Sequence, residues 1–137
     1  MTVQFHLALP CVSINKTRLF YEGILGAQIG RSAVKWADIN LFDHQITFTE
    51  CGPFKFDSKS YSFNGDILPS FHFGVILDKA EWENVRQRLI SKNVPIVSQV
   101  KFLENKTGEH ESFFVKDPND YTVEFKCFSK ASDVFNA

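Results

Sequence analysis

The sequence predicts an α+β protein of two βαβββ modules that form one cup-shaped, mostly antiparallel mixed sheet. A short apolar strand with a histidine near its start, Phe5–Leu9, recurs 66 residues later as Phe71–Val75. A helical pattern and then three strand candidates follow each copy. The repeat therefore predicts two copies of one supersecondary unit in a chain whose 137 residues fit a single domain.

The first module follows this order between residues 5 and 50. Apolar residues spaced three to four apart between Ile14 and Leu25 predict a helix, with Asn15 as its N-cap and Gly26 just past its end. Three short segments after the helix have strand composition, and the turn-like pair Asp43-His44 separates the last two. These strand candidates are Ala27–Arg31, Val34–Leu41 and Gln45–Glu50.

The second module repeats the order. Asp78 is expected to cap a helix whose apolar face carries Trp82, Val85 and Leu89, and which ends near Lys92-Asn93. The turn-rich segment 117–120 separates the last two strand candidates. The three candidates are Ile96–Phe102, Glu111–Lys116 and Thr122–Phe128.

Composition sets the boundaries of the modules and excludes several partners. Module one covers about 1–51 and module two about 70–128, with a Gly-, Pro- and Ser-rich linker at 52–69 and a polar tail at 129–137. A formal charge of −1 gives no basic field to attract nucleic acid or an anionic membrane. There is no long apolar run and no secretory leader pattern, so we expect a cytoplasmic protein.

Three strand residues form the candidate metal site. His6 and His72 occupy equivalent positions of the repeat, and a pseudo-two-fold between the modules would let them converge. Glu124 is a carboxylate within an apolar strand, and such a group is costly to bury without a cation. Two imidazoles and one carboxylate form a facial triad with open coordination positions. His6, His72 and Glu124 are therefore the predicted ligands of one divalent ion.

Other residues are candidates for the pocket around this ion. Strand parity points Gln45 and Thr47, rather than His44, into the cup. Phe54 belongs to an aromatic stretch that would either cover the cup as a lid or anchor the linker. His110 precedes a strand, where it would act as acid or base or simply face solvent.

Four segments resemble the vicinal-oxygen-chelate superfamily, which includes glyoxalase I, bleomycin-resistance proteins, fosfomycin-resistance enzymes and extradiol dioxygenases. They are FHLALPCVSINKTRLFYEGILGAQIGR, WADINLFDHQITF, PSFHFGVIL and GEHESFFVKDPNDYTVEFKCF. The resemblance is greatest to small predicted extradiol-type dioxygenases, and it implies the same ligands, His6, His72 and Glu124. Two-domain extradiol enzymes usually have a pocket tyrosine ten residues before the ligand glutamate. Phe114 stands there in this chain, and no histidine precedes His72 in the second module.

The resemblance implies a small-molecule enzyme and a homodimer. The first hypothesis is a metal-dependent dioxygenase of extradiol type, with Fe(II) favoured and Mn, Zn or Ni as other ions. The second is a glyoxalase-like metal-dependent isomerase, epimerase or lyase. The third is a non-catalytic drug-sequestering protein, and the His-His-Glu set argues against it. One scaffold hosts all three functions, so the fold alone does not choose among them.

Overall fold

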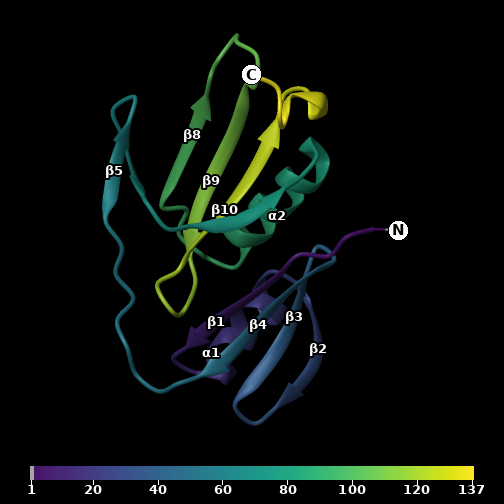
Figure 1. Cartoon of the computed structure of the whole chain (residues 1–137), viewed down its shortest axis with the longest axis vertical. Coiled ribbons are helices and arrows are strands. Elements are labelled where there is room, and N and C mark those ends of the chain that lie inside the picture. The colour runs from purple at the N-terminus through teal and green to yellow at the C-terminus, as the bar shows by residue number, and fades with distance from the viewer. Residues whose placement is uncertain (1) are drawn as a thin grey trace. The chain divides into compact units, whose positions relative to one another are not determined.

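The computed structural model describes residues 2–137, and the chain divides into two compact units. Unit 1 comprises the residues up to Phe56 together with Asp117–Asp120. Unit 2 comprises Asp57–Lys116 and Tyr121–Ala137. Each unit contains one mixed four-stranded sheet (Figure 1).

Unit 1 has the strand–helix–three-strand order that the sequence predicts. Its sheet has the order β1-β4-β3-β2, with β1 parallel to β4 and the other pairs antiparallel. The elements are β1 (His6–Cys11), α1 (Ile14–Arg18), η1 (Leu19–Ile24), β2 (Gln28–Ala33), β3 (Trp36–Leu41) and β4 (His44–Glu50).

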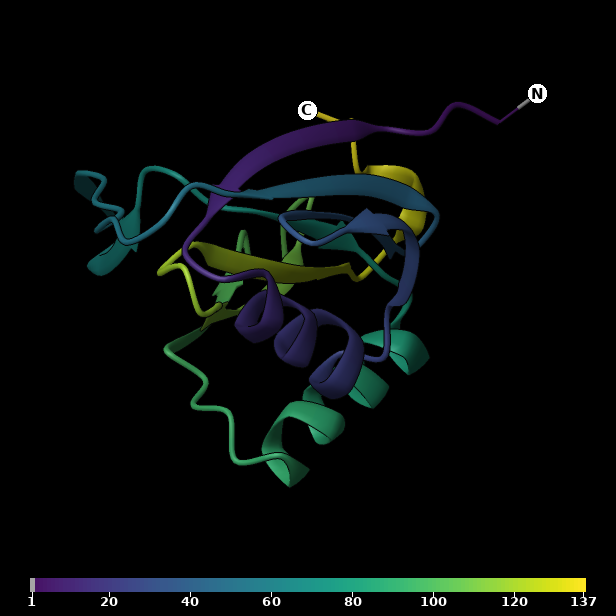
Figure 2. The same cartoon turned by 90° about the horizontal axis from the view of Figure 1, so that it is seen from below.

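The helical segment of unit 1 starts earlier than expected. Ser13 is the N-cap, and its side chain accepts a hydrogen bond from the Lys16 amide, so the expectation for Asn15 is wrong by two residues. A serine in extended backbone satisfies one free amide of the first turn. The segment α1–η1 lies along one face of the sheet (Figure 2), and the Tyr21 ring packs against Phe48 with centroids 5.0 Å apart.

Unit 2 repeats the topology with the order β7-β10-β9-β8, again with one parallel pair, β7 with β10. Asp78 caps α2 by accepting a hydrogen bond from the Glu81 amide, as predicted. Trp82 holds α2 to the sheet, since its Nε1–H donates to the Phe125 carbonyl at 2.8 Å. The elements are β7 (Phe73–Ile76), α2 (Lys79–Ser91), β8 (Ser98–Phe102), β9 (His110–Lys116) and β10 (Thr122–Phe128). The α+β class and the two βαβββ modules are thus confirmed.

The segment expected as a linker contains a β-hairpin in its second half. Strands β5 (Ser60–Phe63) and β6 (Asp66–Pro69) pair across Asn64-Gly65, both of which have positive φ. Asn-Gly is the usual sequence for such a two-residue hairpin turn. The hairpin belongs to unit 2, where Leu68 joins a buried cluster with Val100, Phe102 and Phe114.

The short turn 117–120 belongs to unit 1, although the strands on either side of it belong to unit 2. Tyr21 donates its hydroxyl hydrogen to Asp117 at 2.9 Å, and the Val12 amide donates to Asn119 at 2.8 Å. Both acceptor side chains are buried. These bonds explain why the turn groups with unit 1.

Among the described residues, no helix has the length and apolarity that crossing a membrane requires.

Candidate metal and substrate site

His72 and Glu124 lie together in unit 2. His72 immediately precedes β7, and Glu124 lies in the middle of the neighbouring strand β10, opposite Gly74. The His72 Nε2 atom is 3.4 Å from Glu124 Oε2. The structure therefore brings two of the three predicted metal ligands into direct proximity.

The orientation of the His72 ring suits metal binding. Its Nδ1 atom is 3.1 Å from the Pro69 carbonyl oxygen, which can only accept, so we assign the ring proton to Nδ1. A neutral ring then presents the Nε2 lone pair toward the Glu124 carboxylate. Two such groups facing each other are stabilised by a shared cation, and a carbonyl on the second ring nitrogen is the usual support of a metal-binding histidine.

The separation of the two groups also fits an ion. Ligand atoms about 2.0–2.2 Å from one ion are about 2.8–3.6 Å apart, for angles at the ion between about 90° and the tetrahedral value. The observed 3.4 Å between Nε2 and Oε2 falls in this range. Glu124 Oε1 is occupied by Lys126, whose Nζ lies 3.1 Å away, which leaves Oε2 as the oxygen available to an ion. His72 and Glu124 therefore fit the role of two metal ligands.

A cavity of about 200 Å³ opens beside this pair, within unit 2. His72 and Glu124 contribute to its wall together with His110 and Lys126. Aromatic and leucine side chains from the β5–β6 hairpin and from β8 complete it. The remaining lining residues are Tyr61, Phe63, Leu68, Phe102 and Leu103.

His110 is held within this cavity wall by two aromatic rings. It stacks on Phe102 with centroids 4.8 Å apart and lies 4.7 Å from the Phe128 centroid. Its Nδ1 is 2.8 Å from the Gly108 carbonyl oxygen, so the same assignment leaves a lone pair on Nε2. His110 is thus part of the same cavity as His72 and Glu124, in a form that can accept a proton.

Phe114 lies against the His72 ring, with centroids 5.6 Å apart and the rings perpendicular. Its side chain is fully buried in the cluster with Leu68, and it does not line the cavity. Phe114 therefore orients the imidazole through packing. The sequence predicts that Phe114 lines the pocket, but in the structure it packs behind the His72 ring instead.

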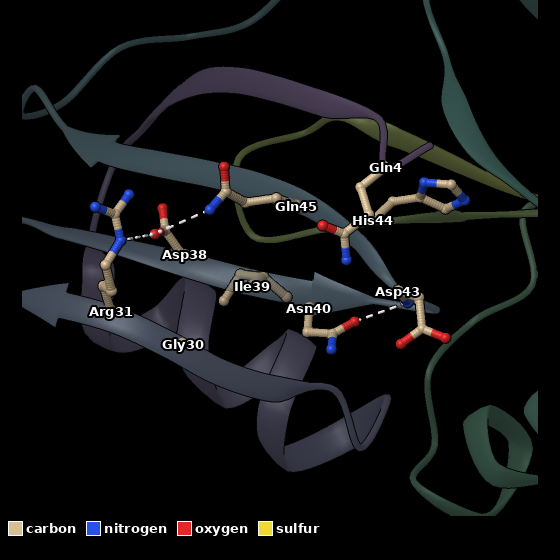
Figure 3. Close-up of a pocket in the computed structure, with 9 residues that line it drawn as sticks. All are labelled: Gln4, Gly30, Arg31, Asp38, Ile39, Asn40, Asp43, His44 and Gln45. Carbon is tan, nitrogen blue, oxygen red and sulfur yellow. Dashed lines mark hydrogen bonds and ion pairs between the residues drawn. The ribbon is translucent and has the colours of Figure 1, made fainter. Parts of the chain in front are cut away.

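The corresponding open face of unit 1 is a polar network centred on Asp38 of β3. Thr47 donates its hydroxyl to Asp38 Oδ1 at 2.6 Å, while Arg31 Nε and Gln45 Nε2 donate to Oδ2 at 3.0 and 3.2 Å. Figure 3 shows the Arg31 and Gln45 bonds. Gln45 and Thr47 do share one face, as strand parity predicts, and both are engaged by this carboxylate.

Asp38 is buried, and its hydrogen bond from Thr47 is the main reason that its pKa lies below the usual range. The charged Arg31 and the nearby His6 act in the same direction. Sequence reasoning missed this residue. The signal was the alternation Ala37, Ile39, Leu41, which places Asp38 on the polar face of a strand, as for Glu124.

A second cavity, of about 240 Å³, lies beside this network within unit 1 (Figure 3). It is lined by Gln4, Gly30, Arg31, Asp38, Ile39, Asn40, Asp43, His44 and Gln45. His44 is a structural residue, because its Nδ1 accepts a hydrogen bond from the Phe5 amide at 3.0 Å. His44 and Gln45 both line this cavity, and Gln45 also donates to Asp38.

Two further predicted site residues, His6 and Phe54, also belong to unit 1. His6 lies on the polar face of β1, opposite Gln45. Phe54 lines neither of the two cavities. Within residues 2–137, no three His, Cys, Asp or Glu side chains cluster as a metal site. The predicted triad draws His6 from unit 1 and the other ligands from unit 2, so its third ligand stays a prediction.

The sequence matches no protein-family model, and no curated protein matches it. Solved structures do match over nearly the whole chain. A glyoxalase/bleomycin resistance protein/dioxygenase from Alicyclobacillus acidocaldarius has a TM-score of 0.82 and 23% identity, covering 98% of this chain and 97% of its own.

Two further similar structures carry different activities in their names. The fosfomycin resistance protein FosX from Listeria monocytogenes has a TM-score of 0.69 and 16% identity, covering 97% of this chain and 98% of its own. Lactoylglutathione lyase from Agrobacterium tumefaciens has a TM-score of 0.64 and 13% identity, covering 93% and 94%. These likenesses, together with the βαβββ topology of both units, show that the chain has the glyoxalase/bleomycin-resistance/dioxygenase fold.

Proposed function

We propose that this protein is a metal-dependent enzyme for a small molecule with two neighbouring oxygen atoms, and that its reaction is an extradiol-type dioxygenation. The supporting observation is the His72–Glu124 pair, whose Nε2 and Oε2 atoms are 3.4 Å apart. The other ring nitrogen of His72, Nδ1, is held by the Pro69 carbonyl. His6 is proposed as the third ligand because it occupies the position of His72 in the repeat.

The donor set favours iron. Two histidines and one carboxylate are typical of non-haem Fe(II) oxygenases and leave positions open for ligands. Asp38, the buried carboxylate of the polar face in unit 1, accepts three hydrogen bonds and is not a free fourth ligand. A bound divalent ion would polarise the substrate oxygens and stabilise negative charge that develops on them.

The cavity residues supply the other functions. His110 Nε2 accepts the proton of a substrate hydroxyl, since Nδ1 is engaged with the Gly108 carbonyl. The aromatic and leucine side chains of the cavity would pack against the apolar part of a substrate. Dioxygen is the oxidant, and both of its atoms enter the product when the ring carbon–carbon bond breaks.

Metal binding is the first test. His6→Ala, His72→Ala and Glu124→Ala should each weaken binding of Zn²⁺ or Mn²⁺ by at least about 100-fold, because even outer-shell partners of metal ligands contribute about 10–100-fold. His44→Ala and Glu104→Ala are the controls, since His44 serves the Phe5 amide and Glu104 is exposed. Unchanged affinity in the three variants, measured by competition with a chromophoric chelator, would refute the assignment.

Oxygen uptake tests the reaction class. Protein loaded anaerobically with Fe(II) should consume oxygen with at least one member of a catechol and hydroxy-acid panel. His110→Ala should slow turnover by about 10²–10⁴-fold, which is the usual contribution of a positioned proton acceptor.

A metal-dependent isomerase, epimerase or lyase is the second candidate. It is favoured by His110, which lines the cavity and is not a proposed metal ligand, because one imidazole would suffice to move a proton between substrate carbons. Solvent deuterium entering a 2-oxo or hydroxy-carbonyl substrate without oxygen uptake would assign this class. A protein that binds a ligand tightly, without turning it over and without a bound metal, would instead be a sequestering protein.

We also propose that the protein is a homodimer. Each four-stranded sheet ends in edge strands, β1 and β2 in unit 1 and β7 and β8 in unit 2, and such edges are normally paired or covered. A two-fold dimer is the default small homo-oligomer. Light scattering that gives the monomer mass at tens of micromolar would reject this proposal.

A further inference from the structure

Among residues 2–137, Lys126 is the one lysine or arginine that lines the cavity of unit 2. It follows Glu124 by two residues on β10, so the two side chains share a face of the sheet. Strand β10 lies between β7 and β9 and is not an edge strand. The usual explanation of a strand lysine, that it discourages pairing at a sheet edge, therefore does not apply here.

The surroundings of Lys126 hold its ammonium group in place. The Lys126 side chain is only 29% exposed, and its Nζ is 3.1 Å from Glu124 Oε1. In the part of the chain that the structure describes, Glu124 is also the only carboxylate side chain that lines the cavity. In the metal-bound state proposed above, the carboxylate shares its charge with a divalent ion. The cavity wall then carries net positive charge, which an anionic ligand would balance.

The other walls define the shape of that ligand. Phe63 and Phe102 line the cavity with aromatic rings whose centroids are 5.4 Å apart. His110 also lines it, although its ring is stacked on Phe102 and packed against Phe128. Aromatic walls favour a flat apolar ligand through offset and edge-to-face contacts. An apolar cavity of about 150 Å³ holds one benzene molecule. A cavity of about 200 Å³ therefore accommodates a single ring with a small substituent.

We propose that the cavity of unit 2 takes a single-ring aromatic carboxylate, and that Lys126 recognises the carboxylate group. This deepens the proposed function, because it assigns the substrate class of the same cavity. Lys126 is a binding residue in this proposal: its ammonium group donates to the carboxylate while the ligand ring packs against the aromatic wall.

The test uses benzoate and its neutral analogue benzamide, titrated into the full-length protein and followed by chemical-shift changes. Wild-type protein should bind benzoate at least about tenfold more tightly than benzamide, the ratio expected for one charge-assisted hydrogen bond. Lys126→Met should remove this preference, while Lys126→Arg should restore most of it. Lys126→Gln serves as the neutral variant if Lys126→Met does not fold.

Lys101→Met is the matched control. This lysine of β8 is 47% exposed in its side chain and lines no part of the cavity, so the benzoate preference should persist. A merely structural Lys126, needed only to neutralise Glu124, would change stability without changing the benzoate-to-benzamide ratio. That result would overturn the proposal. Inorganic phosphate that competes as well as benzoate would also overturn it, because the ring would then contribute nothing.

Titrations with and without Zn²⁺ separate the two proposals. If Zn²⁺ fails to bind but the metal-free protein still prefers benzoate in a Lys126-dependent way, the proposed function fails and the substrate class stands. If Zn²⁺ binds through His72 and Glu124 but neither form of the protein prefers benzoate, the substrate class fails alone.

Discussion

In each unit a buried carboxylate lies in the equivalent row of residues paired across the sheet. The two carboxylates, however, lie on different strands. In unit 1 the strand pairing aligns Ala8 of β1 with Thr47 of β4 and Asp38 of β3. In unit 2 it aligns Gly74 of β7 with Glu124 of β10 and, on β9, a phenylalanine, Phe114. Counted along the chain, the acidic residue thus lies on the third strand of the first sheet, β3, and on the fourth strand of the second sheet, β10.

This displacement by one strand changes what the carboxylate can do. Asp38 has hydrogen-bond donors on both neighbouring strands, and Arg31, Gln45 and Thr47 satisfy it. Glu124 has neighbours without side-chain donors in its own row, and it turns to His72 and Lys126 instead. A carboxylate whose oxygens are all hydrogen-bonded, such as Asp38, stabilises its sheet. Glu124 has one oxygen that faces an imidazole, and this oxygen is available to a metal ion.

Gly74 is a further structural difference between the two sets of aligned residues. A Cβ atom at Gly74 would overlap the backbone carbonyl oxygen of Glu124, whereas Ala8 occupies the same place in unit 1. The close approach of β7 to β10 therefore needs a glycine.

Gly74→Ala should have the largest effect on stability, a loss of at least about 3 kcal/mol, because backbone cannot move aside as a side chain can. Urea unfolding followed by circular dichroism would measure it. Gly30→Ala is the matched control, since its Cβ would meet the Asp38 Cβ at 3.5 Å, an ordinary contact. A similar small change in both variants would show that β7 and β10 do not approach so closely in solution.

Asp38→Ala should cost about 2 kcal/mol of unfolding free energy, because it leaves Thr47 and Gln45 without their acceptor. The ion pair with Arg31 adds little to this cost, since the arginine side chain is 78% exposed. The variant should bind Zn²⁺ as wild type does. A hundredfold loss of Zn²⁺ affinity with unchanged stability would make Asp38 a ligand and remove the contrast between the units.

The pH dependence of stability sharpens the same contrast. The pKa of Asp38 is lowered on folding, chiefly by the Thr47 hydrogen bond, so its charged form stabilises the folded state. This contribution is complete above the unfolded-state pKa of about 3.9 and is lost as the pH falls through the lower folded-state value. The stability difference between wild type and Asp38→Asn should therefore be constant above about pH 5 and shrink below about pH 4. A difference that grows on acidification would contradict the direction of the shift.

Thr122→Val should have the smallest effect. The Thr122 hydroxyl is buried on the Glu124 face of β10 without a hydrogen-bond partner in the part of the chain that the structure describes. Replacing an unsatisfied hydroxyl by a methyl group of the same shape is neutral or stabilising, by up to about 1 kcal/mol. Thermal unfolding of the metal-free protein measures this. Destabilisation beyond about 0.5 kcal/mol would show that the hydroxyl has a partner in solution.

Much of this protein follows from local sequence. The recurrence of a histidine-bearing strand predicts both modules, the cap at Asp78 follows from residue type, and alternation places Gln45 and Thr47 on one face of β4. The pairing of His72 with Glu124 was also predictable, from the repeat and from an acidic residue inside an apolar strand. The cap and the strand alternation are signals that lie within a few residues, where backbone geometry determines where a side chain points. The repeat instead relates two segments that are 66 residues apart.

Strand register and packing decided the rest. The three donors around Asp38 depend on how β2, β3 and β4 align, and the sequence period alone does not specify that alignment. The place of His110 in the cavity depends on β8 and on a hairpin within the expected linker, although Asn64-Gly65 signalled the turn. The donors to Asp38 come from β2 and β4, so a pattern within β3 alone could not show that Asp38 is saturated.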